Sequence, residues 1–363
     1  MPRFVLSLSQ TSSLKGIALI ALLVHHLFYL RTGKYDDIHL TGNLYLFNQI
    51  GLICKVCVSL FVFLSGYGLT VVADKTGIIN KRTFYVRRFT KLMSNYWLIW
   101  LLFVPIGIFF IGRSFADVYA GHSIGCCLIA DLAGLSTALG WPSYNATWWF
   151  YSCIIMLYLL FPFIYQVIRK SLLGTCILLA VSIGIVFCPL TLIQPIRYYL
   201  ITFILGILFA NQLVINNLII FSGRWKILTR CMEGHALKGE KVIWILLMLV
   251  TLIIRNFIPY SLLFDSVICL AIYFVYININ WIKRFDKVLG FLGKHSFNIF
   301  LFHTFIYKIY WPEVIFWSRN PLVIFAMLLC ISLLISIAIE YIKYRGRFYQ
   351  LEQSLMNKLI DSN

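Results

Sequence analysis

Two adjacent histidines, His25 and His26, lie in an apolar stretch near the N-terminus that begins beside Lys15. In a helix with a rise of about 1.5 Å per residue, they lie about 15–17 Å beyond Lys15, near the middle of a membrane. An ionisable side chain at that depth is costly, so it usually serves a function or bonds to a neighbouring helix. Successive side chains point about 100° apart, so the two histidines cannot both face one partner. The pattern predicts that one of them faces a cavity.

A neutral, buried histidine can serve catalysis in two ways. It can take the proton from an attacking hydroxyl group as a general base, or it can hold a transferred group briefly as a nucleophile. His303, halfway through another apolar stretch, could support catalysis or orient a substrate, and a packing role is the alternative. His122 and His235 lie in polar segments, where we expect them to be solvated.

Basic residues gather before the third apolar stretch, at Arg87, Arg88 and Lys91. Such a cluster could hold the phosphates of an acyl donor through charge-assisted hydrogen bonds, and Lys15 could join it. The general excess of Lys and Arg on the cytoplasmic side of membrane proteins explains the cluster equally well. Trp149 also has two interpretations, a stacking platform for a sugar ring or a member of an interfacial aromatic belt. The residue types alone leave both questions open.

The composition identifies the surroundings of these residues as a membrane. Of the 363 residues, 61% are hydrophobic and only 12% are charged, whereas a soluble domain is about half apolar and a quarter charged. The net charge of +18 does not indicate nucleic-acid binding, because the bases lie in connectors between apolar runs. Most cysteines lie inside these runs, and we expect reduced packing residues, among them Cys153, Cys176, Cys269 and Cys330.

The apolar runs predict an all-α, polytopic membrane bundle of ten transmembrane helices, in a single domain spanning residues 1–363. The sequence contains no internal repeat, separate soluble domain or nucleotide-binding loop, which argues against an ATP-driven transporter. The first apolar run lacks a small-residue cleavage site, so we expect the N-terminus to be retained. The predicted spans lie near residues 14–30, 50–72, 92–112, 148–168, 171–189, 197–221, 242–258, 260–279, 291–311 and 321–342.

Charge bias orients this bundle. With ten spans and both termini in the cytoplasm, most of the 31 basic residues fall on the cytoplasmic side, many of them in connectors 73–91 and 222–241. Counting 113–147 as a further span would place the basic connector 222–241 outside, against this bias. We therefore expect 31–49 and 113–147 to be outer segments, with a re-entrant path as the alternative for the second.

Six segments, taken in order, resemble the acyltransferase-3 family of membrane O-acyltransferases. The first is the spacing of Lys15 and His26, with ten residues between a base and a histidine. The others are LFVFLSGYGL (60–69), YVRRFTKLMSNYW (85–97), TWWFYSCIIMLYLLFPFI (147–164), RYYLITFILGILFA (197–210) and LGKHSFNIFLFHTFIY (292–307). The resemblance therefore extends over nearly the whole chain.

The resemblance implies a membrane acyltransferase that moves an acetyl or similar group from acetyl-CoA to a hydroxyl of an exported or cell-surface carbohydrate. It implies a multi-pass protein of the bacterial plasma membrane, surrounded by lipid, without a permanently bound cofactor, a metal or a nucleic-acid partner. The expected catalytic residues are His26 and His303. The expected substrate-binding residues are Lys15, Arg87, Arg88, Lys91 and Trp149.

Two positions depart from the family pattern. The family usually has arginine where Lys15 stands, and lysine cannot make the same bidentate contact with a phosphate or carboxylate. Many members have glutamate where this chain has Ile154, so we expect no carboxylate role there. His25 lies off the matched spacing and should be a polar helix contact. Gly66 and Gly206 should allow close approach of helices.

Two other functions remain open. A transporter or flippase for polysaccharide or lipid-linked sugar would also have ten or more helices with scattered polar residues, but it would not bind an acyl donor. A glycan polymerase needs bases in a large outer loop to bind a lipid phosphate, and 113–147 carries only Arg113. Transfer of acetyl to a glycan would distinguish an acyltransferase from both.

Overall fold

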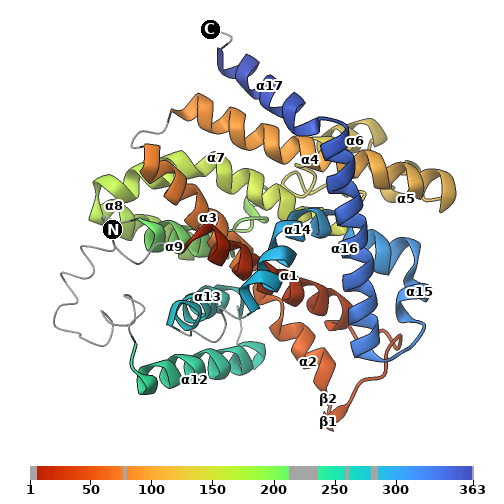
Figure 1. The fold of residues 1–363 in the computed structure, drawn as a ribbon, viewed down its shortest axis with the longest axis horizontal. Coiled ribbons are helices and arrows are strands. Elements are labelled where there is room, and N and C mark those ends of the chain that lie inside the picture. The colour runs from red at the N-terminus through yellow and green to blue at the C-terminus, as the bar shows by residue number, and fades with distance from the viewer. Residues whose placement is uncertain (1–5, 77–79, 212–235, 258–260, 279–284, 362–363) are drawn as a thin grey trace.

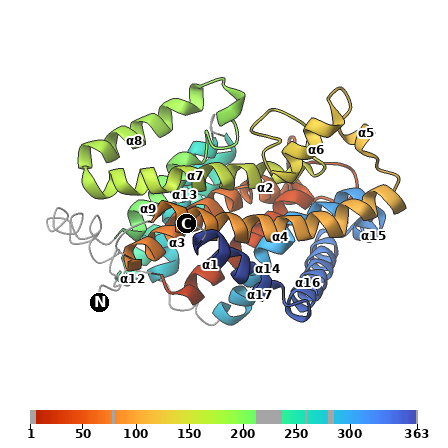
Figure 2. The same cartoon turned by 90° about the horizontal axis from the view of Figure 1, so that it is seen from above.

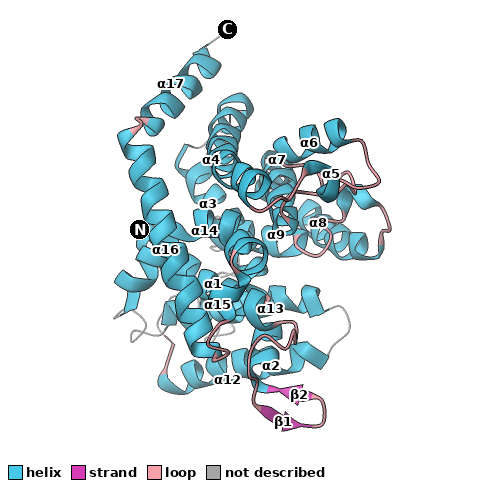
Figure 3. Cartoon of the chain, turned by 90° about the vertical axis from the view of Figure 1, so that its right-hand side faces the viewer, coloured by secondary structure: helices cyan, strands magenta, loops and turns pink. Residues whose placement is uncertain are grey.

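The computed structural model describes residues 6–76, 80–211, 236–257, 261–278 and 285–361, and this part of the chain is almost entirely helical (Figures 1 and 3). The predicted all-α class is confirmed for these residues, since their strands form only one short hairpin, β1 (His39–Thr41) and β2 (Leu44–Tyr45). The α-helices are α1 (Leu8–Phe28), α2 (Leu46–Ile53), α3 (Val56–Thr76), α4 (Lys81–Phe110), α5 (Phe115–Val118), α6 (Ile124–Leu132), α7 (Trp149–Lys170), α8 (Leu172–Gly184), α9 (Leu200–Ala210), α12 (Lys238–Ile254), α13 (Ser261–Asn278), α14 (Asp286–Thr304), α15 (Pro312–Phe316), α16 (Pro321–Arg345) and α17 (Phe348–Asp361). The shorter helical segments are η1 (Ala146–Trp148), η2 (Ile185–Phe187), η3 (Thr191–Ile193), η4 (Arg255–Phe257) and the π-helix η6 (Phe305–Tyr310).

Within the described residues, five helical stretches are long and apolar enough to cross a membrane. They are Leu8–Phe28, Leu46–Lys75, Lys81–Phe110, Ala146–Lys170 and Pro321–Arg345. Three shorter apolar helices coincide with further predicted spans, at Leu172–Phe187, Leu200–Ala210 and Leu262–Asn278. The two remaining predicted spans coincide with α12 and with α14 followed by η6. The bundle of ten spans and its orientation stay a prediction. The end of the span at 197–221, most of connector 222–241 and His235 lie outside the described residues.

The basic cluster before the third span lies on a helix rather than in a connector, which corrects the predicted boundary. Helix α4 begins at Lys81, where the side chain of Asn80 caps it by accepting a hydrogen bond from the N–H of Thr83. Arg87, Arg88 and the residues around them therefore project from the first turns of α4 at fixed helical angles. Neighbouring bases in the sequence consequently face different directions.

Helices α1 and α14 form the centre of the bundle and pack against each other more extensively than any other pair of described elements (Figures 1 and 2). Two glycines make this contact close. A Cβ atom at Gly16 would overlap the carbonyl of Leu289, and one at Gly293 would overlap the carbonyl of Ser12. Ser13 adds a hydrogen bond of 3.1 Å to the carbonyl of Asp286. The backbones of α1 and α14 are therefore in direct contact at the end where Lys15 lies.

A second close contact joins α3 and α9. A Cβ atom at Gly66 would overlap the carbonyl of Phe203, and one at Gly206 would overlap the carbonyl of Phe63. The expectation that these two glycines permit close helix packing is confirmed. Gly68 lies two residues further along α3, and a Cβ atom there would have no neighbour within 4 Å. The requirement for glycine is therefore specific to the face of α3 that contacts α9.

The segment 113–147 is folded around a buried carboxylate. Asp131 is 1% exposed and accepts hydrogen bonds from the hydroxyls of Tyr119 (2.9 Å) and Ser143 (2.5 Å) and from the N–H of Tyr144 (2.7 Å). Burial raises the pKa of Asp131, and these donors act against that rise. The segment is thus an ordered element held by a polar centre, whereas the sequence predicted an outer segment, with a re-entrant path as the alternative, and did not identify this centre.

Helix α17 runs beside α4 and closes one side of the bundle (Figure 1). Glu352 accepts a hydrogen bond of 2.9 Å from Ser94, and Arg82 donates one of 2.8 Å to the carbonyl of Leu359. On the adjacent α16, Lys343 pairs with Glu340 at 2.7 Å. These contacts fix the first turns of α4, from which the basic cluster projects.

A buried ion pair joins α12 to α13. Arg255, in η4 at the end of α12, contacts Asp265, and the guanidinium also donates a hydrogen bond of 3.0 Å to the carbonyl of Leu52. Among the described cysteines none forms a disulfide, and the predicted packing role fits only those that are buried. Cys153 and Cys269 are buried, whereas Cys176 and Cys330 lie exposed on the outside of the bundle.

Candidate active site

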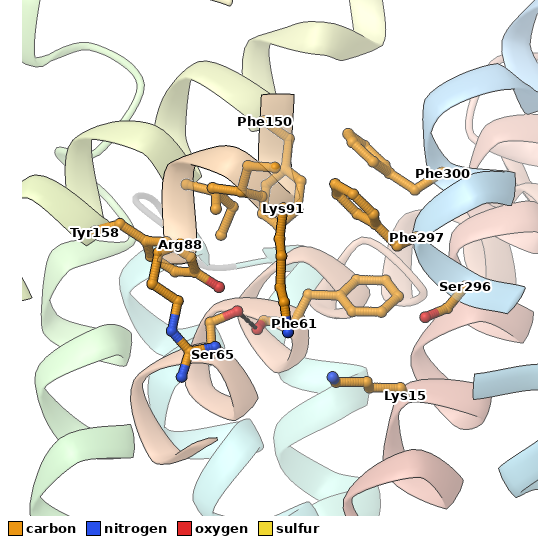
Figure 4. A pocket seen from close by; sticks show the side chains of 12 residues that line it. Lys15, Phe61, Ser65, Arg88, Lys91, Phe150, Tyr158, Ser296, Phe297 and Phe300 are labelled. Carbon is orange, nitrogen blue, oxygen red and sulfur yellow. Dashed lines mark hydrogen bonds between the residues drawn. The ribbon is translucent and has the colours of Figure 1, made fainter. Parts of the chain in front are cut away.

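Three cations from two helices line one cavity of about 380 Å³. Lys15 comes from α1, and Arg88 and Lys91 come from α4, where their spacing of three residues places them on one face. Figure 4 shows the nitrogen ends of all three turned toward the part of the cavity where Ser65 lies. The structure therefore brings together residues that are more than 70 positions apart in the sequence.

These cations have no carboxylate partner among the described residues. The ion pairs of that part of the chain involve Arg255, Arg319 and Lys343, and none reaches the cavity. Three like charges that face one space repel one another unless an anion neutralises them. The arrangement suits an anionic ligand with several charges, such as a phosphorylated molecule.

The rest of the cavity is apolar and aromatic. Phe61, Phe150 and Phe300 line it, and the rings of Phe150 and Phe300 meet edge to face with centroids 5.0 Å apart. Ile154 lies in the same wall. No acid is therefore placed among the lining side chains, and the remaining lining residues are Leu92, Tyr158, Ser296 and Phe297. The cavity has one charged end and one apolar end.

Two of the predicted binding residues lie away from this cavity. Arg87 is exposed and is not among the lining residues, because it points about 100° away from Arg88 on α4. Trp149 stacks on Tyr199, with ring centroids 5.6 Å apart, and does not line the cavity either. Its neighbour Trp148 is only 2% exposed and is part of the core.

Two histidines meet further along α1, where α1 packs against α14. His26 lies against His303 of α14, with ring centroids 4.9 Å apart. Tyr307, one turn beyond His303, stacks on it at 6.1 Å and lies 6.3 Å from His26. The two histidine-bearing spans are therefore neighbours. His303 is fully buried, whereas His26 retains part of its exposure.

Two further histidines behave as their positions in the sequence indicated. His25 is buried and its Nδ1 lies 2.8 Å from the carbonyl of Gly51 in α2, so it is a polar contact between helices. His122 is exposed. His26 lies in the last turn of α1, contacts His303 of another helix and retains part of its exposure.

Several lining residues escaped the sequence argument. Ser65, Tyr158 and Ser296 are ordinary in type and had no recognisable spacing relative to the bases. Tyr307 did carry a signal, because it follows His303 by four residues and therefore lies on the same helical face. Its position in the π-helix η6 keeps it beside His303.

Comparison with known proteins gives one result that covers most of the chain. The model of the acyltransferase-3 family, described as an acyltransferase domain, matches residues 12–341. Neither the curated proteins nor the solved structures give a match. The matched region includes both histidines of the pair and all three cavity cations. The chain is a membrane protein of the acyltransferase-3 family, and its domain is an acyltransferase domain.

Proposed function

We propose that this protein transfers an acetyl or similar acyl group from acetyl-CoA to a hydroxyl of an exported or cell-surface carbohydrate. One observation carries the proposal: the unpaired cations of α1 and α4 and the His26–His303 pair of α1 and α14 are joined by a shared helix, α1. The cations can thus bind a charged donor while His26, further along α1, is positioned to act as a base.

The donor binds with its phosphates at the cationic end of the cavity. Lys15, Arg88 and Lys91 supply charge-assisted hydrogen bonds to the phosphate oxygens. Lys15 and His26 are eleven residues apart on one helix, which corresponds to about 17 Å along its axis. Coenzyme A carries its thioester on a long flexible arm, so the anchored phosphates and the reacting carbonyl can be that far apart. The aromatic wall of Phe150 and Phe300 lies beside the path of this arm.

The transfer uses His26 in one of two roles. As a general base, it takes the proton of the acceptor hydroxyl while the oxygen bonds to the acyl carbon and the carbon–sulfur bond breaks. As a transient carrier, it first accepts the acyl group and then passes it to the hydroxyl. In both cases the coenzyme leaves as a thiolate and takes up a proton.

The cavity should face the cytoplasm, where acetyl-CoA is made. The basic residues of α4 and the excess of bases in the predicted inner connectors support this orientation. It can be tested by introducing single cysteines at Asp117 and at Lys238, both exposed, in a variant without the native cysteines. In intact bacteria an impermeant thiol reagent should label the cysteine at Asp117 only. Labelling at Lys238 alone would reverse the orientation.

The activity itself is tested with purified protein in liposomes, acetyl-CoA and a crude glycan fraction of the host. A glycan product that gains acetyl mass, with release of free coenzyme A, supports the proposal, and His26→Ala provides the inactive control. A wild-type protein that neither binds acetyl-CoA nor releases coenzyme A would favour the transporter or flippase.

A further inference from the structure

A line of buried polar side chains joins the start of α7 to His303. It consists of Asn145 and Thr147, at η1, and Thr304, at the end of α14. The Thr147 hydroxyl lies 2.8 Å from Asn145 Oδ1 and 3.1 Å from the Thr304 hydroxyl. The Thr304 hydroxyl lies 3.4 Å from Nε2 of His303. The line therefore ends at a ring nitrogen of the histidine pair.

The direction of these hydrogen bonds follows from the chemistry of their ends. The backbone N–H of Thr147 can only donate, so the Asn145 atom that it meets at 3.0 Å is the carbonyl oxygen Oδ1. The Thr147 hydroxyl faces the same oxygen and must donate to it. Its lone pairs then accept the proton of the Thr304 hydroxyl. Thr304 consequently presents a lone pair to His303.

The other nitrogen of His303 is equally determined. Nδ1 lies 2.9 Å from the carbonyl of Ile299 and 3.0 Å from that of Phe300, and both oxygens can only accept. Nδ1 therefore carries a hydrogen in every state of the ring. Nε2 is the atom on which His303 gains and loses a proton, and Thr304 can bond to it only when that proton is present.

The backbone at this point is also unusual. Helix α14 changes into the π-helix η6 immediately after Thr304, and π-helical segments occur frequently at functional sites. The indole N–H of Trp148 donates a hydrogen bond of 2.9 Å to the carbonyl of Leu301, which ties η1 to the last turn of α14. The hydroxyl line is thus held between two elements that are fixed to each other.

We propose that Asn145, Thr147 and Thr304 are positioning residues that hold His303 ready to take a proton at Nε2 during acyl transfer. The inference rests on the proposed function. As the acceptor oxygen bonds to the acyl carbon and the carbon–sulfur bond breaks, the hydroxyl proton passes to the His26–His303 pair and then to the leaving thiolate. No further reactant is needed.

The test compares two substitutions at one position. Thr304→Val keeps the shape of the side chain and removes the hydroxyl, so we expect kcat to fall about tenfold with the KM for acetyl-CoA unchanged. Thr304→Ser restores the hydroxyl and should recover most of the rate. Thr147→Val should reproduce the loss, because it breaks the same line one step further away.

The matched control is Thr202→Val. Thr202 is fully buried and shares a hydroxyl hydrogen bond of 2.7 Å with Ser266, between α9 and α13 and outside the site. The Thr202→Val substitution should lower the thermal midpoint as much as Thr304→Val does and leave kcat unchanged. Wild-type kcat in Thr304→Val, or an equal loss of kcat in Thr202→Val, would overturn the inference while the proposed function stands. An inactive wild-type protein would overturn both.

Discussion

The two ends of the α1–α14 pair are built in opposite ways. At one end, Lys15, Arg88 and Lys91 line an open cavity, and no carboxylate of the described chain pairs with them. At the other end, His303 is fully buried and both of its ring nitrogens contact hydrogen-bonding partners. The cations are unpaired at the end where the ligand is to bind. The polar groups are hydrogen-bonded at the end where the histidines must keep a fixed position.

This difference separates binding from chemistry. Unpaired cations become favourable only when an anion from outside neutralises them, so the cationic end should govern affinity for the donor. A histidine with fixed partners has one orientation and one titrating nitrogen, so the histidine end should govern the rate of transfer. Substitutions at the two ends should therefore change different kinetic constants.

The largest effect should come from the histidine end. His26→Ala removes the proposed base or acyl carrier, and transfer should fall about 10²–10⁴-fold or more with insertion in the membrane intact. His25→Ala should be much milder, because His25 bonds to the carbonyl of Gly51 and not to the histidine pair. Initial rates of coenzyme A release measure both. An inactive His25→Ala variant together with an active His26→Ala variant would show that the catalytic role belongs to His25.

The cationic end should show a smaller effect, and on affinity. Arg88→Gln removes one charge from the cavity, so the KM for acetyl-CoA should rise about tenfold or more while kcat changes little. Arg87→Gln is the matched control, since it removes the same charge one residue away, on an exposed face outside the cavity. Equal effects of the two substitutions would show that the cluster acts only through its general charge.

The smallest effect should come from the packing of α3 against α9, outside the two ends. Gly66→Ala forces a Cβ atom against the carbonyl of Phe203 and should destabilise the protein by about 1–3 kcal/mol. Gly68→Ala, on the same helix, meets open space and should leave the thermal midpoint in detergent nearly unchanged. If the two variants melted alike, the α3–α9 contact would not be as close as the structure has it.

The histidine spacing and the apolar runs made several features of this molecule predictable from its sequence. His26, His303 and Lys15 were identified by two signals, the rarity of ionisable residues within or beside long apolar runs and the resemblance of their positions to the family pattern. The helical class and the close contacts of Gly66 and Gly206 followed from composition and from residue size. Each of these features depends on the local sequence alone.

Features that depend on the angle of a side chain around its helix were harder to predict. Arg87 and Arg88 are equivalent in a list of residues, and only the start of α4 at Lys81 decides which of them enters the cavity. Asn145, Thr147 and Thr304 are common polar residues whose role arises only when α7 and α14 are adjacent. Contacts between distant segments leave no periodic signal in a single sequence.

The pairing of α1 with α14 has a consequence for the synthesis of the protein. A chain is made from its N-terminus, so α1 leaves the ribosome before any residue of α14 exists. During that interval His26 lacks the neighbours, His303 and Tyr307, that the finished bundle provides, and ionisable groups without partners are costly in lipid. Helix α1 is therefore least stable in the membrane before α14 has been made. It gains its full stability only when nearly the whole chain has been translated.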